Sequence, residues 1–129
     1  ALPSKLNEEE KNKLKPLFEE VAGKERYTVV FESMSETDMP VQITRPEFMR
    51  RMKDMSMLGG ASYMGNFPDS FNLVVNSNHP LIARLNDEKD ETNRKTLARQ
   101  MTDLAKLAQN LLKGEELTGF IKRSVEIIK

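Results

Sequence analysis

Hydrophobic residues near the start of the chain recur at helical spacing. Four apolar residues fall at i, i+3, i+4 and i+7, which predicts a helix over residues 6–22. Pro16 stands inside this pattern and is expected to kink or split the helix, because proline lacks an amide donor. Gly23 is expected to end the helix, since glycine readily adopts the backbone conformation that closes one. The apolar stripe consists of Leu14, Leu17, Phe18 and Val21.

Three short segments rich in β-branched and aromatic residues predict strands. They are residues 27–34, 41–44 and 71–76. Between the second and the third segment, residues 45–58 predict a helix that a pair of glycines closes. The middle of the chain therefore predicts a small sheet whose strands are separated by a helix and by a loop.

Helical patterns occupy the last third of the chain. A short helix is expected over residues 80–85, a long one from about residue 90 to residue 113, and a last one from residue 115 onward. Gly114 separates the last two. The order of elements predicts a single α+β domain over residues 1–129, with a small three-stranded sheet flanked by helices and a C-terminal helical hairpin.

The two C-terminal helices carry more apolar surface than the seam between them can cover. A Leu or Ile side chain left in water forgoes about 1.5 to 3 kcal/mol of burial free energy. Either a symmetric partner covers the excess, forming a four-helix bundle, or the chain's own sheet does, and the pattern alone leaves both open. The first helix carries Leu97, Met101, Leu104, Ala108 and Leu111, and the second carries Leu117, Phe120, Ile121, Val125 and Ile128.

Methionines cluster in one part of the sequence. The chain has eight, and five of them lie between residues 49 and 64. Phe48, Met52 and Met55 share one sector of the predicted helix. Because methionine is unbranched and polarisable, such a stripe suits a surface that binds varied partners. Packing of the same stripe on the sheet as ordinary core is an equally open alternative.

Composition excludes several classes of site. Twenty basic residues balance twenty acidic ones, so no overall positive field favours nucleic acid or an anionic membrane. Cysteine is absent, which excludes disulfides and thiolate sites, and the single histidine, His79, cannot form a metal centre of the usual kind alone. Its position before Pro80 favours capping or packing. No phosphate-binding loop or hydrolase motif occurs, so catalysis and metal or cofactor binding are not expected.

Three long stretches resemble one family. Residues 45–55 (RPEFMRRMKDM), 71–80 (FNLVVNSNHP) and 104–124 (LAKLAQNLLKGEELTGFIKRS) are similar to the C-terminal dimerisation domain of bacterial heat-shock protein 90 (HtpG) chaperones. The order of elements matches along nearly the whole chain. The resemblance implies a fragment of an ATP-dependent, cytoplasmic, homodimeric chaperone whose nucleotide site lies in another domain.

The same resemblance implies two sets of site residues. The terminal helices would pair with those of a second copy, and the methionine-rich helix would contact unfolded client proteins. The chain does not end in the acidic tail that tetratricopeptide co-chaperones read in eukaryotic relatives, so those partners are not expected. The implied dimer residues are Leu104, Leu107, Leu111, Leu112, Leu117, Phe120, Ile121 and Val125; the implied client residues are Phe48, Met49, Met52, Met55 and Leu58.

Two other functions remain as alternatives. The first is a standalone helical dimer with a regulatory role, which tight and salt-dependent DNA binding would support. The second is an enzyme that uses Asp or Glu residues on its loops, which a deep pocket with paired, perturbed carboxylates would support.

Overall fold

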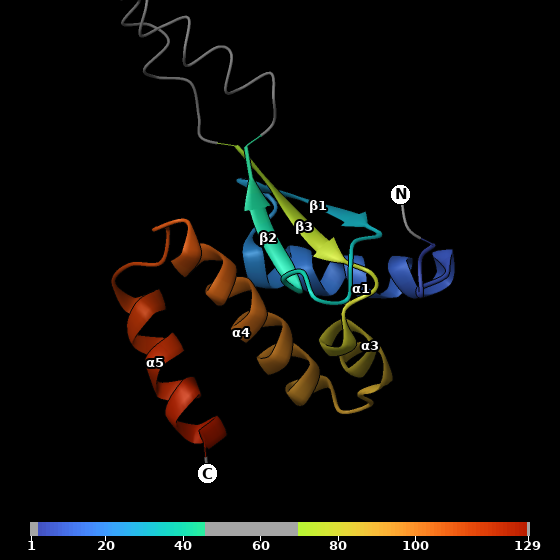
Figure 1. Cartoon of the computed structure of the whole chain (residues 1–129). Coiled ribbons are helices and arrows are strands. Elements are labelled where there is room, and N and C mark those ends of the chain that lie inside the picture. Colours follow the sequence, from blue (N-terminus) through green and yellow to red (C-terminus); the bar gives the residue numbers. More distant parts are fainter. Residues whose placement is uncertain (1–2, 46–69, 129) are drawn as a thin grey trace, which may run out of the picture.

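The computed structural model describes residues 3–45 and 70–128, and within them the predicted α+β fold is confirmed. The helix predicted over residues 45–58 lies outside the described residues except for Arg45, which follows a strand and is not helical. The elements are α1 (Glu8–Ala22), β1 (Tyr27–Glu32), β2 (Val41–Thr44), β3 (Phe71–Asn76), α3 (Pro80–Asp87), α4 (Glu91–Ala108) and α5 (Glu115–Ile128) (Figure 1).

The three strands form one mixed sheet in the order β1-β3-β2. β1 runs parallel to β3, with Tyr27 opposite Phe71, and β2 runs antiparallel to β3, with Val41 opposite Val75. Alternate residues of the two outer strands are buried, whereas the central strand β3 is buried along nearly its whole length. The sheet therefore buries one face, and its middle strand forms the centre of the domain.

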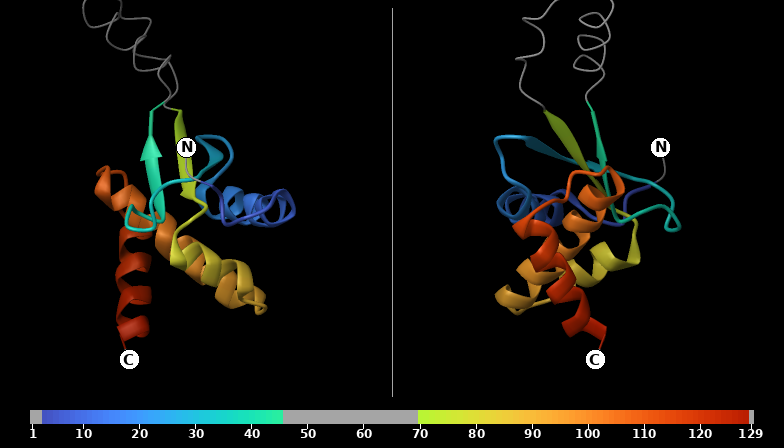
Figure 2. Two further views of the ribbon diagram at one scale, coloured as in Figure 1. Left: turned by 45° about the vertical axis from the view of Figure 1, so that its right-hand side comes forward. Right: turned by 90° about the vertical axis from the view of Figure 1, so that its left-hand side faces the viewer.

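Helices α1 and α4 cover the sheet. α1 contacts β1, α4 contacts β2, and the two helices contact each other. Two further views show the helices gathered on the same side of the sheet (Figure 2). The core between these layers is apolar and tightly closed: Leu14, Phe18, Leu73, Val75, Ile82, Leu85 and Ala98 are fully buried.

Helix α1 is not split at Pro16, contrary to the expectation from the sequence. It runs without interruption from Glu8 to Ala22. Pro16 removes one intrahelical hydrogen bond, the one to the carbonyl of Asn12. Both residues are exposed, so water can satisfy that carbonyl, and the buried stripe on the other side of the helix holds it together. Gly23 ends the helix as predicted, at a positive φ of 97°.

Helix α4 ends at Ala108, five residues before the predicted end. Asn110 takes a positive φ of 60°, a left-handed conformation that asparagine tolerates better than most residues. The amide of Leu111 then donates to the carbonyl of Lys106 at 2.7 Å, and the amide of Asn110 donates to that of Leu107 at 3.1 Å. These two bonds form a Schellman motif. The turn at Asn110 therefore ends the helix before Gly114 is reached.

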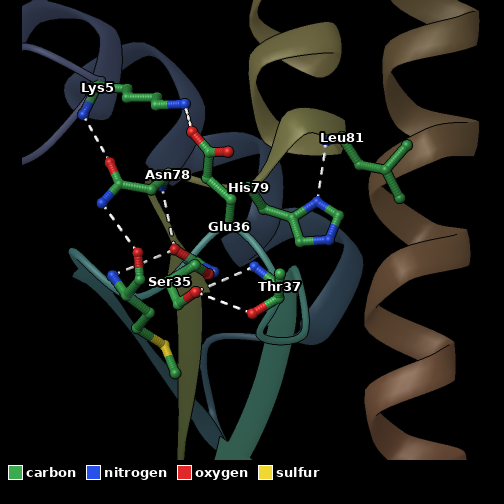
Figure 3. A network of polar contacts seen from close by, with 9 residues as sticks. Lys5, Ser35, Glu36, Thr37, Asn78, His79 and Leu81 are labelled. Atoms are coloured by element: carbon green, nitrogen blue, oxygen red, sulfur yellow. Dashed lines mark hydrogen bonds and ion pairs between the residues drawn. The ribbon is translucent and has the colours of Figure 1, made fainter.

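A polar network joins the N-terminal segment to the corner between β3 and α3. Asn78 accepts a hydrogen bond from the amide of Lys5 at 2.8 Å and donates to the carbonyl of Met34 at 2.9 Å (Figure 3). His79 caps α3, because its Nδ1 accepts from the amide of Leu81 at 3.0 Å. The prediction of a capping histidine is thus confirmed, and this residue has a structural role.

Replacement of Leu73, which is fully buried in the central strand, should destabilise the fold strongly. We expect Leu73→Ala to lower the free energy of unfolding by about 2 to 5 kcal/mol, because it removes buried methyl groups and leaves a cavity. Urea denaturation followed by circular dichroism would measure the change. Leu81→Ala is the matched control, since Leu81 is 39% exposed, and its effect should be several-fold smaller. Equal losses for the two variants would contradict the assigned core.

Candidate interaction surface

The last helix leaves most of its large apolar side chains exposed. None of the described residues of α5 is buried, although the helix is rich in Ile, Leu and Val. α4 is its main neighbour, and α5 lies beside α4 at the edge of the molecule, away from α1 (Figure 1). A helix that packs on its own domain normally buries its apolar stripe. Here Ile121, Val125 and Ile128 remain in water, whereas Leu117 and Phe120 are half-buried.

Exposed apolar side chains gather on the α4–α5 hairpin. Six of the eight large exposed hydrophobic residues that the described part of the chain contains lie on these two helices. Scattered exposed hydrophobic residues are normal in proteins, but a concentration on one element indicates an interaction surface. Their exposed fractions are 40% for Leu104, 44% for Leu107, 53% for Ile121, 65% for Val125, 56% for Ile127 and 78% for Ile128.

Polar contacts hold α5 against α4. Gln100 donates from Nε2 to Oγ of Ser124 at 2.7 Å, and its Oε1 accepts from Nε of Arg123 at 3.1 Å. Arg123 also forms an ion pair with Asp103 through Nη2. Nearer the turn, Nζ of Lys106 lies 2.9 Å from Oε2 of Glu116. Charged and hydrogen-bonding groups therefore form part of the contact between the helices, beside the half-buried Leu117 and Phe120.

Asp103 is the most deeply buried charged group in this contact. Its residue is 1% exposed, and its Oδ1 has no hydrogen-bond partner among the described residues. Burial raises the pKa of the Asp103 carboxyl above its ordinary value, and the neighbouring charge of Arg123 opposes that rise. The carboxylate is thus kept in place by its cationic partner while its surroundings disfavour the charged form.

The predicted dimer residues divide into three groups. Leu104, Leu107, Ile121 and Val125 are exposed, and Leu117 and Phe120 are half-buried. Leu112 is buried, at 3% exposure, and Leu111 packs against the core, so these two serve mainly the chain's own fold. They fall on the turn after α4 rather than on its helical face, because the helix ends early. Ile128 is not among the predicted dimer residues, but it lies seven residues after Ile121, on the same face of the helix, and is also exposed.

The predicted client residues, Phe48, Met49, Met52, Met55 and Leu58, lie outside the described residues. Exposure and burial of the methionine stripe therefore both remain predictions from the sequence.

An open cleft of about 870 Å³ lies between α1 and the turn that joins α3 to α4. Acidic and basic side chains mix along it, including Lys13, Glu20, Asp87 and Lys89. Asp103, the carboxyl group with a raised pKa, lies elsewhere, at the α4–α5 contact. Within residues 3–45 and 70–128, no three His, Cys, Asp or Glu side chains are grouped to hold a metal ion.

Among the described residues, no helix is both long enough and apolar enough to cross a bilayer.

Comparison with known proteins gives a consistent result. The chain is 42% identical to the chaperone protein HtpG of Porphyromonas gingivalis, over 87% of this chain and 16% of that protein. It is 31% identical to the chaperone protein HtpG of Bacteroides fragilis and 30% identical to that of Bacteroides thetaiotaomicron, over 81% of this chain and 25% of each relative. No protein-family model matches the chain. The chain spans a quarter or less of the length of these curated relatives.

The raised pKa of Asp103 predicts a specific dependence of stability on pH. A carboxyl group whose pKa is higher in the folded than in the unfolded state binds protons more tightly when folded. Its stabilising contribution is therefore complete below the ordinary pKa and is lost as the pH rises through the folded value. Asp103→Asn, which resembles the protonated form, should abolish this loss.

Urea unfolding of the wild type and of Asp103→Asn, from about pH 4 to about pH 7, would measure the effect. The wild type should lose stability relative to the variant as the pH rises. Asp87→Asn, at an exposed position, keeps Asp103 and should lose stability relative to Asp103→Asn in the same way as the wild type, so it controls for changes in net charge. A stability difference between the wild type and Asp103→Asn that stays constant across the range would contradict the assignment.

Proposed function

The chain is a partial HtpG-like chaperone sequence, and from that premise we propose that its last two helices join two copies of it into a homodimer. One observation carries the proposal: α5 leaves four large apolar side chains exposed, while its Arg123 and Glu116 form ion pairs with α4. Such an arrangement leaves free energy unused in a single copy. A second copy that covered the same residues would recover it.

The energetic argument favours a symmetric partner. Burying a Val, Leu or Ile side chain fully is worth about 1.5 to 3 kcal/mol, so the exposed residues of two copies together could offset the entropic cost of association. In a two-fold interface each copy offers the same patch, and no second kind of surface is needed. The apolar face that we assign to this contact is Leu104, Leu107, Leu117, Ile121, Val125 and Ile128.

A homodimer gives the chaperone a physical advantage. Two protomers that are held together at one end meet elsewhere at a high effective concentration, so weak contacts between their other parts become significant. The hairpin lies at one edge of the described fold, so a second copy that pairs with it would not cover α1 or α3 (Figure 2). The dimer contact and the rest of the surface can thus serve different partners.

We further propose that the methionine-rich segment binds unfolded clients. The support is the sequence pattern: Phe48, Met52 and Met55 share one helical sector, and Met49 and Leu58 flank it. Methionine side chains adapt to many shapes, which suits a site that must accept varied non-native chains.

Removal of apolar side chains from α5 should dissociate the dimer. We expect Ile121→Ser combined with Val125→Ser to raise the dimer dissociation constant by at least about 100-fold, because two buried apolar groups are lost from each copy. Light scattering coupled to gel filtration, at a series of micromolar concentrations, would measure it.

The control for this variant is Lys122→Ser combined with Glu126→Ser, which changes exposed polar positions of the same helix. It should leave the dissociation constant nearly unchanged. If the wild-type chain remains a folded monomer at the highest concentration, the homodimer proposal is wrong.

Replacement of two methionines tests the client site separately. Met52→Ser combined with Met55→Ser should weaken binding of a fluorescently labelled unfolded polypeptide, measured by anisotropy, and leave the dimer intact. Lys53→Ser combined with Asp54→Ser is the control within the same segment. Loss of cooperative folding in the methionine variant would instead show that the stripe is core.

A further inference from the structure

Polar side chains of α5 relate its orientation to that of α4. Arg123 and Glu116 both reach α4, and they lie seven residues apart, on one side of the helix. The apolar row lies on the side of Ser124 instead. Leu117 and Ile121 stand seven and three residues before Ser124, and Ile128 stands four residues after it. Arg123 and Glu116 thus face α4, with the half-buried Phe120 three residues before Arg123, and the apolar row lies next to them, along the line of Ser124.

A matching row exists on α4. Leu104 and Leu107 lie four and seven residues after Gln100, so they share its side of the helix. Since Gln100 donates to Ser124 at 2.7 Å, this hydrogen bond joins the two apolar rows. The exposed leucines of α4 and the exposed apolar residues of α5 consequently lie on the same side of the hairpin.

Behind this bridge, Arg123 fixes the helix in two directions. Its guanidinium donates through Nε to Gln100 at 3.1 Å and through Nη2 to Asp103, which is almost completely buried. A planar guanidinium with two such acceptors tolerates little rotation, because its donors form a rigid fork. Apolar packing alone lacks this directionality and would allow α5 to roll about its axis.

We propose that Gln100, Asp103, Arg123 and Ser124 form a polar clamp that positions α5 so that one register of pairing with a second copy is favoured. The inference rests on the proposed homodimer and concerns how its interface is oriented. In helical assemblies, a polar pair within an apolar seam sets register and partner at some expense of stability. The clamp likewise combines directional polar bonds with a cost in stability, because it keeps the Asp103 carboxylate buried where water would solvate it better.

The absence of cysteine from the chain makes the test direct. A single Val125→Cys should cross-link two copies through a short bismaleimide, because Val125 lies on the apolar face. Glu126→Cys, at the adjacent exposed position on another side of the helix, should cross-link poorly. The ratio of the two yields reports the orientation of α5 in the dimer.

The clamp is then removed without leaving an unpaired buried charge, by Asp103→Asn combined with Arg123→Met. The ratio of Val125 to Glu126 cross-linking should fall at least about fivefold, because α5 is free to roll. Arg123→Lys, which keeps the charge and loses the fork, should lie between this variant and the wild type. A ratio within about twofold of the wild type in the double variant would overturn the clamp.

A second measurement distinguishes failure of the clamp proposal from failure of the homodimer proposal. It also shows whether the double variant folds poorly. Hydrogen exchange of the α5 amides is compared between the wild type and the double variant, each carrying Ile121→Ser and Val125→Ser to keep it monomeric. Faster exchange in the double variant that is confined to α5, with the core still protected, supports the clamp. This holds even if the wild type proves monomeric, and in that case only the homodimer proposal is wrong. Unchanged exchange in α5, or equal loss of protection throughout the core, would overturn the clamp as a positioning element.

Discussion

The burial of charged groups between α4 and α5 determines what the rest of this surface can do. Asp103 and Arg123 occupy the positions where apolar side chains would ordinarily close a helical hairpin. With those positions taken, Ile121 and Val125 remain exposed. The ion pair therefore converts a hairpin that could have been closed by its own seam into one that presents an apolar face outward.

The core of the described residues does not depend on α5. The sheet is held by its central strand, and α1, α3 and the inner side of α4 complete the core without any buried residue from α5. Ala98, Met101 and Ala105 face the core, whereas Leu104 and Leu107 on the same helix do not. α4 thus serves two surfaces at once, and this explains why its apolar residues exceed one stripe in the sequence.

Periodicity predicted the elements well where local preference and burial agree. The strand over residues 71–76 and the stripe of α1 are regular patterns whose buried side is also their apolar side. The end of α4 was missed because Asn110, rather than a glycine, takes the left-handed conformation. The polar clamp could not be predicted for another reason: Asp103 looks like a surface residue in the sequence, yet in the fold it is buried and paired with Arg123 of α5.

The same reasoning explains why the candidate surface could be recognised in part. An excess of apolar residues on the last helices predicted that something must cover them, but a count of residues does not distinguish a partner from the chain's own sheet. The structure divides the set, since Leu112 and Leu111 contribute to the chain's own core while Ile121 and Val125 do not. Which residues remain exposed depends on a few directional polar bonds rather than on hydrophobicity. Affinity and orientation of the proposed dimer are therefore carried by different side chains: apolar ones supply the free energy of association, and Gln100, Asp103, Arg123 and Ser124 supply its geometry.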